Sequence, residues 1–328
     1  MRCISKTAAF TLMICLVFAV YGCGSGETLT DSYDVYEMAD SLGISATGSD
    51  TSKNYFSTGL CVSEDIALGT DATTSSVAEG AGAFNLSTGE VVYAKNLYER
   101  LYPASTTKIL TAYLALKYSD DLNVYVTVSE NAANQAADSS VCDLKAGDRV
   151  TLRDLLYGMM LRSGNDAAIA IAEHLAGSVE AFAELMNQEA AAMGATQTHF
   201  VNPNGLPDEN HYTTVYDMYL IFAKALENQM FSEIIAAKSY DVVYTNAQGE
   251  SVEKTWENTN LYLTGEAKTP EGFTILGGKT GTTGEAGYCL VLYSQNASGQ
   301  PIISIVFKAD GKSNLYMLMN EILAGFAN

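Results

Sequence analysis

The stretch "GFTILGGKTGTTGEAGYCLVLYS", residues 272–294, decides between two folds. A phosphate-binding loop reads G-x-x-x-x-G-K-[ST] and needs a glycine six residues before its lysine, but Phe273 holds that position before Lys279. The loop also needs a helix directly afterwards, whose N-terminal N–H groups face the phosphates. Here a glycine-broken run leads into a strand pattern rich in Tyr, Val and Leu. The stretch therefore excludes a nucleotide loop and predicts a strand that carries Lys279-Thr280-Gly281.

Further strand patterns lie on both sides of a long region with helical periodicity. Strands are predicted at 82–96, as a hairpin around Ser87-Thr88-Gly89, and at 239–245, 273–279, 287–294 and 301–308. Helices are predicted at about 105–118, at 151–177 with a break at 163–165, and at 179–193, 215–228 and 313–328. Strands at both ends with helices between them predict an α/β (α+β) fold. In it, one antiparallel sheet is flanked by helices and an all-helical subdomain is inserted.

The N-terminus reads as an export signal and a tether. Arg2 and Lys6 precede an apolar run, and residues 1–22 are predicted to be a signal peptide. Cys23 follows in a context similar to that of bacterial lipoproteins, which predicts lipidation and attachment to the outer face of the cell membrane. The alternative is an ordinary cleaved signal with secretion. Residues 23–79, rich in Ser, Thr, Gly and Asp, are predicted to be a flexible linker.

Charge and composition exclude several function classes. The formal net charge of -20 argues against a nucleic-acid partner, because few cations are present to neutralise phosphates. Outside the signal the cysteines are Cys61, Cys142 and Cys289, which are widely spaced and allow at most one disulfide. The three histidines fall on different predicted elements, and no H-E-x-x-H occurs. We therefore expect neither a metal site nor a cofactor.

Ser105 and Lys108 form an S-x-x-K pattern at the start of a predicted helix. Residues three apart on a helix share a face, so the lysine lies beside the hydroxyl. A serine is a poor nucleophile until a base removes its proton, and a lysine serves as that base only when its pKa is lowered. Ser251 and Lys254 fit the same pattern, but they lie in a polar stretch beside a turn. Only the first pair precedes a strong amphipathic helix.

Ser163 and Asn165 form an S-x-N pattern at the break between two predicted helices. The pattern is weak, because it also matches at Ser52, Ser129 and Ser294. Those matches fall in the tether or at strand ends and turns, whereas Ser163 interrupts an apolar helical region. Burying polar groups inside an apolar helical region costs free energy, so we expect this break to serve a function.

Taken together, the motifs are more specific than any one alone. S-x-x-K, S-x-N and K-T-G occur in this order, which is the signature of penicillin-binding proteins and serine β-lactamases. Residues 81–326 resemble the serine D-alanyl-D-alanine carboxypeptidases, the low-molecular-mass penicillin-binding proteins. The resemblance includes "YPASTTKILTAYLAL", "LLYGMMLRSGNDAAIAIAEHLAG", "FVNPNGLPDENHYTT" and "GGKTGTTGEAGYCLV". It implies a β-lactamase/transpeptidase-like fold and a catalytic domain at 80–328.

The resemblance also implies catalytic roles. Ser105 attacks the carbonyl of the penultimate D-alanine in a peptidoglycan stem peptide, and Lys108 acts as its base, kept neutral by the nearby Lys279. Ser163 and Asn165 bridge Lys108 to the leaving amine and the peptide. The terminal D-alanine leaves and water hydrolyses the acyl-enzyme. Penicillin, a β-lactam that mimics the D-Ala-D-Ala end, is expected to acylate the same serine.

Substrate binding is implied for the strand that carries Lys279, Thr280, Gly281 and Thr282. Lys279 and Thr280 receive the terminal carboxylate, and the N–H groups of Ser105 and Thr282 form the oxyanion hole. Many family members carry a C-terminal β-domain and an amphipathic membrane helix. This chain has little sequence after the K-T-G strand, so membrane attachment is expected to come from the N-terminal lipid.

Three rival functions stay open at this point. A class A β-lactamase needs an E-x-x-L-N segment for deacylation, and the nearest match between Asn165 and Lys279 is Glu184 to Asn187, one residue short and on an ordinary helix. A D,D-endopeptidase acting on cross-links would use the same residues as a carboxypeptidase. A surface lipoprotein that keeps the fold as a binding module is the third.

Overall fold

The computed structural model describes residues 60–61 and 77–326. The predicted signal peptide at 1–22, the lipidation site Cys23 and most of the predicted linker lie outside the described residues. Within the described part of the chain, no helix has both the length and the apolar character needed to cross a membrane.

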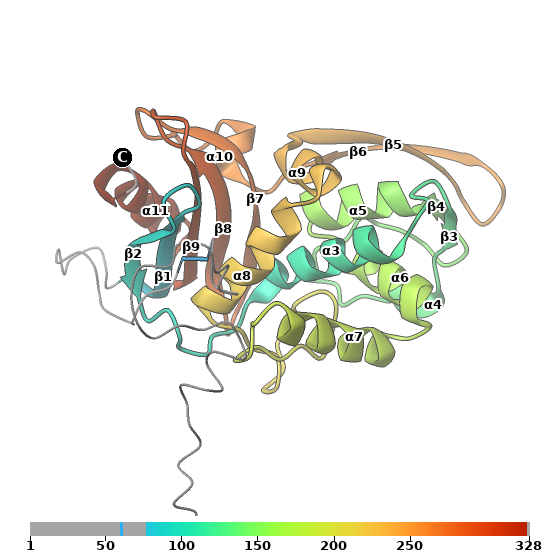
Figure 1. The fold of residues 1–328 in the computed structure, drawn as a ribbon. Helices are drawn as coiled ribbons and strands as arrows, with labels where there is room; N and C mark the ends of the chain where they lie inside the picture. Colours follow the sequence, from blue (N-terminus) through green and yellow to red (C-terminus); the bar gives the residue numbers. More distant parts are fainter. Residues whose placement is uncertain (1–59, 62–76, 327–328) are drawn as a thin grey trace, which may run out of the picture. The chain divides into compact units, whose positions relative to one another are not determined.

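A five-stranded antiparallel sheet collects strands from the two ends of the described chain (Figure 1). Its order is β2-β1-β9-β8-β7. The strands are β1 (Ala78–Asn85), β2 (Glu90–Lys95), β7 (Thr274–Thr283), β8 (Gly287–Gln295) and β9 (Pro301–Ala309). The predicted hairpin and the strand that carries K-T-G are both confirmed. The K-T-G strand, β7, is an edge of the sheet, so one side of it is open to a ligand.

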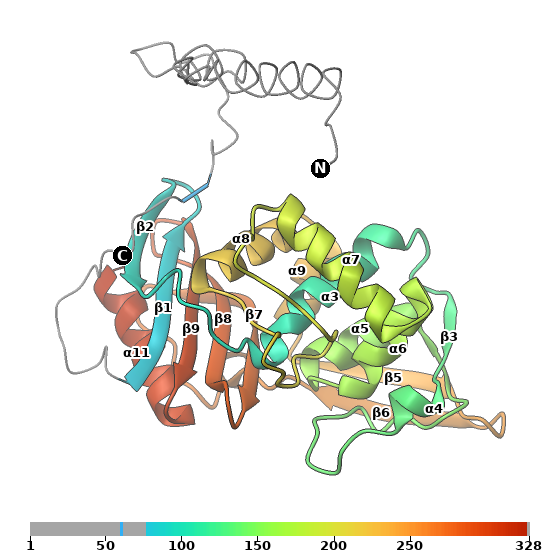
Figure 2. The same ribbon diagram turned by 90° about the horizontal axis from the view of Figure 1, so that it is seen from below.

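Helices cover both faces of this sheet (Figures 1 and 2). Successive side chains of β9 point to opposite faces, as the period of a strand requires. Ile302 and Val306 pack in the hydrophobic cluster that contains α11 (Lys312–Phe326). Ile303 and Ile305 pack in the larger cluster with α3 (Lys108–Tyr118) and α8 (Val215–Leu226). The apolar run of β9 therefore reflects burial on both faces.

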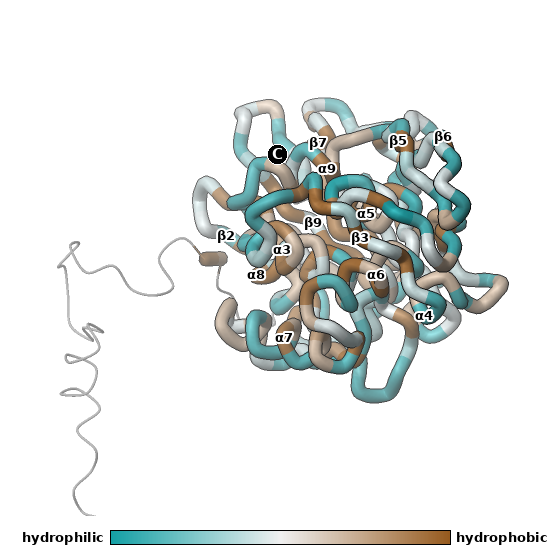
Figure 3. The backbone as a smooth tube through the Cα atoms, turned by 90° about the vertical axis from the view of Figure 1, so that its right-hand side faces the viewer, coloured by the Kyte–Doolittle hydropathy of each residue, from teal (hydrophilic) through white to brown (hydrophobic). Residues whose placement is uncertain are grey.

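The segment between β2 and β7 contains the helices that were predicted there. Besides α3 and α8 they are α5 (Leu152–Leu161), α6 (Asn165–Ala176) and α7 (Val179–Ala192), and η2 (Ala104–Thr107) is a short 3₁₀ turn before α3. Three shorter helices in this segment were not predicted: α4 (Glu130–Ala133), α9 (Gln229–Ala236) and α10 (Leu261–Thr264). Figure 3 shows hydrophobic positions along α3, α6 and α8. Contrary to the expected amphipathic pattern, α3 is buried over most of its surface, because it lies at the centre of the domain with helices around it.

The inserted region also contains a second antiparallel sheet, so the prediction of an all-helical subdomain is wrong in this detail. Its order is β3-β4-β5-β6. The strands are β3 (Tyr125–Thr127), β4 (Arg149–Thr151), β5 (Ser239–Thr245) and β6 (Ser251–Glu257). β3 and β4 have only three residues each, too few to show a period. β6 is charged and its Ser251, Glu253 and Thr255 are exposed, which gives it the composition of a loop.

Part of the predicted linker belongs to the folded domain. Cys61 is fully buried, its N–H donates to the hydroxyl of Tyr219 at 2.9 Å, and its thiol lies 3.5 Å from the carbonyl oxygen of Asn85. Leu60 packs against the larger hydrophobic cluster. A dipeptide within a polar segment gives no period, so the sequence pattern could not reveal this contact.

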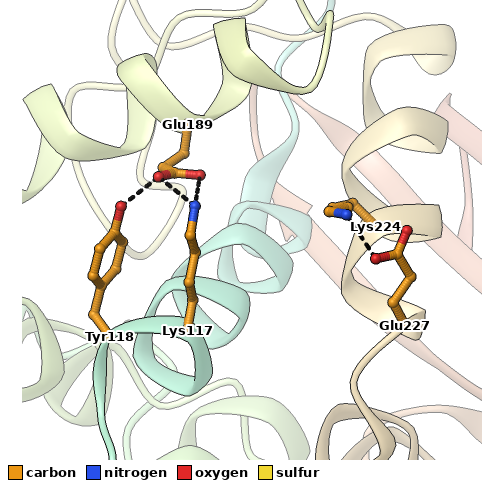
Figure 4. A network of polar contacts seen from close by, with 5 residues as sticks. All are labelled: Lys117, Tyr118, Glu189, Lys224 and Glu227. Carbon is orange, nitrogen blue, oxygen red and sulfur yellow. Dashed lines mark hydrogen bonds and ion pairs between the residues drawn. The ribbon is translucent and has the colours of Figure 1, made fainter. Parts of the chain in front are cut away.

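A polar network fastens the C-terminal end of α3 to α7 (Figure 4). Lys117 donates to both carboxylate oxygens of Glu189, at 2.7 and 2.6 Å, and the Tyr118 hydroxyl donates to the same carboxylate. Lys224 and Glu227 form a separate pair at 2.6 Å, at the end of α8. Such partly exposed pairs contribute about 0–1 kcal/mol each. The buried faces of α3 therefore matter more than its outer charges in holding the helix that begins at Lys108.

Candidate active site

Ser105 lies on the short 3₁₀ turn η2, directly before α3. The preceding residue, Ala104, has φ of 47°, a left-handed conformation that is uncommon for a residue with a side chain. The turn is held by Thr106, whose hydroxyl donates to the carbonyl of Pro103 at 2.7 Å. Strain of this kind costs about 1–3 kcal/mol and persists where the surrounding packing imposes it. The turn leaves Ser105 partly exposed while its neighbours are buried.

Lys108, the first residue of α3, is fully buried and reaches back to the serine. Its Nζ lies 2.9 Å from Oγ of Ser105 and donates to Oδ1 of Asn165 at 2.8 Å. It also donates to the backbone carbonyl of Asn204 at 2.6 Å. The predicted juxtaposition of Ser105, Lys108 and Asn165 is therefore present.

The surroundings of Lys108 favour its neutral form. Burial lowers its pKa well below the ordinary value, and the nearby ammonium group of Lys279 lowers it further. A neutral amine has two N–H donors and one lone pair. The two carbonyl oxygens of Asn165 and Asn204 take the donors, which leaves the lone pair to accept the hydroxyl proton of Ser105. This is the geometry that a general base needs.

Ser163 and Lys279 form the second half of the polar centre. Nζ of Lys279 donates to Oγ of Ser163 at 3.0 Å and to the carbonyl of Thr280 at 2.8 Å. Lys279 is almost fully buried, and this burial lowers its pKa to about 7. Ser163 has φ of 61°, so the break between α5 and α6 is a second strained position beside a candidate catalytic group. The expected bridge from Lys108 is thus divided, since Asn165 contacts Lys108 and Ser163 contacts Lys279.

The edge strand β7 passes close to Ser105. A Cβ atom on Gly281 would lie 2.9 Å from the backbone nitrogen of Ser105, so only glycine allows this approach. The Thr280 hydroxyl lies 2.6 Å from that of Thr259, and Thr282 is exposed, with its hydroxyl donating to the carbonyl of Gly281. Thr280, Gly281 and Thr282 therefore line a cavity together with Ser105, whereas Lys279 contacts Ser163.

The loop at 201–211 supplies contacts that the sequence motifs did not assign. His211 is buried, its Nδ1 accepts from the N–H of Val201, and its Nε2–H therefore donates to the Thr107 hydroxyl at 2.8 Å. Burial lowers its pKa to about 4, so it is neutral at pH 7. Gly205 has φ of 87°, and a Cβ there would lie 1.8 Å from the carbonyl oxygen of Ala104. The family resemblance included this segment, "FVNPNGLPDENHYTT", but assigned no role to its residues.

Asp166, directly after Asn165, holds a second loop at the site. Its buried carboxylate accepts the N–H groups of Cys142 and Leu144 at 2.9 and 3.0 Å. The N–H of Asn165 donates to the carbonyl of Ser140 at 2.8 Å. Burial raises the pKa of Asp166, against the lowering effect of its hydrogen bonds. These contacts place Ser140 beside the nucleophile, a position that the sequence pattern did not indicate.

Two cavities meet at Ser105. The first, of about 430 Å³, is named here the Asp138 cavity, and its lining includes Asp138, Asn204, Leu206 and Glu285. The second, of about 380 Å³, is named the Lys312 cavity, and its lining includes Ser163, Thr259, Thr280, Lys312 and Tyr316. Ser105, Ser140 and Thr282 line both. Lys312, at the start of α11, was not predicted from the motifs, because only the sheet brings it beside Thr280.

The competing motif matches have structural roles. Ser251 is exposed on β6, and Lys254 donates to the backbone carbonyls of Cys142 and Asp143. Ser129 caps α4, and Ser294 is buried on β8. Asn187, in the segment closest to the β-lactamase motif, exchanges two hydrogen bonds with the backbone of Phe200. That segment is an ordinary part of α7, as predicted.

The described residues form neither a cluster of metal ligands nor a disulfide. No group of three or more His, Cys, Asp or Glu side chains gathers at residues 60–61 or 77–326. Cys61, Cys142 and Cys289 are all buried free thiols, so the single disulfide that the sequence allowed does not form. Burial raises the pKa of Cys289 to about 12, as is typical of a small core residue and not of a reactive thiol. His174 is exposed on α6.

Solved structures of similar sequence share this architecture. The crystal structure of the Streptomyces K15 DD-transpeptidase is 33% identical, with a TM-score of 0.68, and the match covers 76% of this chain and 97% of that one. The D-alanyl-D-alanine carboxypeptidase DacD from Francisella tularensis is 28% identical, with a TM-score of 0.66, over 84% of this chain and 75% of that one. These two proteins therefore resemble the chain in sequence as well as in fold.

Curated relatives and a family model agree with the structural match. The D-alanyl-D-alanine carboxypeptidase DacF of Bacillus subtilis is 35% identical over 238 residues, 71% of this chain and 57% of that protein. DacC of Escherichia coli is 37% identical over 229 residues, 67% of this chain and 54% of that protein. The chain thus spans little more than half the length of these two relatives. The model of peptidase family S11, D-alanyl-D-alanine carboxypeptidase, matches residues 70–311, and the chain belongs to this family.

Proposed function

We propose that the protein is a serine D-alanyl-D-alanine carboxypeptidase that removes the terminal D-alanine from peptidoglycan stem pentapeptides. The observation that carries this proposal is the contact between Ser105 and a buried Lys108 whose two N–H donors are both occupied by carbonyl oxygens. The Ser105 hydroxyl transfers its proton to Lys108 as Oγ attacks the penultimate carbonyl. The N–H groups of Ser105 and Thr282 stabilise the oxyanion of the tetrahedral intermediate.

The proton taken by Lys108 then moves to the leaving amine. Asn165 contacts Lys108, and Ser163 contacts Lys279, so the two polar groups lie between the base and the strand. In the proposal, Lys108 gives this proton directly to the nitrogen of the terminal D-alanine as the C–N bond breaks, and Ser163, held by Lys279, orients that nitrogen. Water then attacks the Ser105 ester, with Lys108 again as the base, and restores the free serine.

We assign the terminal carboxylate to the Lys312 cavity. Lys279 is almost fully buried and donates to Ser163 and Thr280, so it acts on the carboxylate mainly through its charge. Lys312 is exposed in the same cavity and offers an ammonium group for direct contact. The Thr280 hydroxyl adds a hydrogen bond. This assignment keeps the expected roles of Lys279 and Thr280 and adds Lys312 to them.

A β-lactam would enter the same path, since its amide carbonyl takes the place of the penultimate carbonyl. Its acyl-enzyme is expected to persist, because α7 places no glutamate of an E-x-x-L-N segment beside Ser105. The proposal therefore favours a penicillin-inhibited peptidase over a β-lactamase. Peptidoglycan lies outside the cell membrane, so an enzyme that acts on it must be exported. We propose that the protein works at the outer face of the cell membrane, anchored by a lipid on Cys23.

Release of D-alanine from a pentapeptide that ends in D-Ala-D-Ala tests the proposal. The purified protein is expected to release one D-alanine per peptide, and Ser105→Ala is expected to release none. Added amine tests transfer to an acceptor, the reaction named for the solved Streptomyces relative. Cross-linked dimers test endopeptidase action, and nitrocefin tests β-lactamase action. Rapid turnover of nitrocefin without release of D-alanine would refute the proposal, and a folded protein inert in all four assays would favour the binding module.

A further inference from the structure

The two cavities that meet at Ser105 carry opposite charges. Asp138 and Glu285 line the Asp138 cavity, and among the described residues that line it there is no lysine or arginine. Lys312 lines the Lys312 cavity, and no described aspartate or glutamate does so. Both carboxylates and the Lys312 ammonium group are exposed, so they face solvent and any bound ligand. The cleft is therefore polarised along its length, with the nucleophile at the point where the charge changes sign.

A stem peptide that reacts at Ser105 has its own order of charges. Under the proposed function, the terminal D-alanine and its carboxylate lie in the Lys312 cavity, beside Thr280. The residues that precede the reacting carbonyl must then leave Ser105 on the other side, through the Asp138 cavity. The third residue of the peptide directly precedes the reacting D-alanine, and consecutive Cα atoms lie about 3.8 Å apart. Its side chain is therefore the part of the substrate within reach of Asp138 and Glu285.

We propose that the Asp138 cavity selects stem peptides whose third residue carries a free side-chain ammonium group. Asp138 lies on the loop fixed by Asp166, and Glu285 lies on the turn between β7 and β8, so two different loops each bring one carboxylate to the cavity. An ammonium group between them would be attracted by both. The inference rests on the proposed carboxypeptidase function and specifies its substrate.

The consequence is a preference for stem peptides that are not cross-linked through that amine. Acylation of the amine, as in a cross-link, removes the charge that the two carboxylates recognise. Exposed charge pairs each contribute modestly, and two together give an expected preference of about threefold to tenfold in kcat/KM. This preference should weaken as salt is raised to 1 M, where the Debye length falls to about 3 Å.

A pair of tripeptides that differ only at the amine tests the inference. One is Nα-acetyl-L-Lys-D-Ala-D-Ala with a free side-chain amine, and the other has that amine acetylated. The ratio of their kcat/KM values is measured for the wild-type protein and for the double variant Asp138→Asn, Glu285→Gln. The matched control is Asp120→Asn, which removes one exposed carboxylate that lines neither cavity. Acylation by penicillin, followed by mass, checks that every variant keeps a functional Ser105.

We expect the free-amine peptide to be favoured in the wild type and in the control, and the ratio to approach one in the double variant. A ratio near or below one in the wild type would overturn the inference, as would a preference that survives in the double variant. Either result would leave the carboxypeptidase standing, because D-alanine is still released. If neither peptide released D-alanine, the proposed function would fail and the inference with it.

Discussion

The chain contains the same S-x-x-K pattern in two regions, and the two copies lie in different secondary structure with different burial. At Ser105 the pattern begins a buried helix, so serine and lysine share a face and Nζ lies 2.9 Å from Oγ. At Ser251 it lies on strand β6, where residues three apart point to opposite faces. Lys254 there donates to the carbonyls of Cys142 and Asp143 at the surface. The chemistry therefore depends on the helix and the burial, not on the four residues.

Replacing the two lysines gives the largest expected difference between the regions. Lys108→Met removes the base, and kcat/KM for D-alanine release is expected to fall by about 10²- to 10⁴-fold. Lys254→Met removes two hydrogen bonds to carbonyls, so it should lower the free energy of unfolding by about 1–2 kcal/mol and leave kcat/KM within about threefold. D-alanine release and urea unfolding measure the two effects. Equal losses of activity in the two variants would mean that burial on α3 does not distinguish Lys108 from Lys254.

Two glycines compare the packing of the loop beside Ser105 with that of the turn before Ser251. Gly205 and Gly249 have nearly the same φ, 87° and 83°, but a Cβ on Gly205 meets the carbonyl of Ala104 whereas nothing lies within 4 Å of one on Gly249. Alanine in a left-handed conformation costs about 1–2 kcal/mol. Gly249→Ala should show this cost alone, and Gly205→Ala should add about 1–3 kcal/mol from overpacking. Urea unfolding measures both, and similar losses would mean that the loop at 201–211 moves aside easily.

The buried lysines at the site also make the stability of the protein depend on pH. The pKa of Lys279 is lowered to about 7 and that of Lys108 is also lowered, so the unfolded chain binds more protons than the folded protein above pH 7. Their contribution to stability is complete above the ordinary lysine pKa and is lost as the pH falls towards 7. The free energy of unfolding should therefore rise from pH 7 to pH 9, by up to about 1.4 kcal/mol per pH unit for each lysine.

Variants separate the two lysine environments in this pH range. Lys279→Met should reduce the slope of unfolding free energy against pH, because the buried lysine no longer titrates. Lys254→Met should leave the slope unchanged, since Lys254 is partly exposed and lies outside the polar centre. A wild-type stability that falls between pH 7 and pH 9 would contradict the account of the buried lysines.

The sequence predicted the catalytic motifs better than their surroundings. Short motifs pointed to Ser105, Lys108, Ser163 and Asn165 as candidates because each needs only local spacing and a helix to place it. The contacts of His211 with Thr107 and of Lys108 with the Asn204 carbonyl depend on a loop about one hundred residues away. A backbone carbonyl has no signature in the sequence at all. Tertiary contacts of this kind therefore appear only in the structure.

The fold shows the same division between local and distant information. Long periodic elements such as α8 and β9 were predicted because their hydrophobic pattern repeats. The strand β5 was predicted, but the second sheet that it forms with β3, β4 and β6 was missed, since two of these strands have three residues and the other is charged. Lys312 could not be assigned to the site, because its place beside Thr280 follows from the packing of α11 on the sheet.

The most direct test of the account is to find the residue that penicillin acylates. The wild-type protein is incubated with benzylpenicillin and digested, and the modified peptide is located by mass spectrometry, with Ser105→Ala and Ser251→Ala as the matched variants. The account predicts one adduct, on Ser105, which is absent from Ser105→Ala and unchanged in Ser251→Ala. An adduct on any other residue, or one that persists in Ser105→Ala, would contradict the claim that a buried lysine on α3 activates this serine.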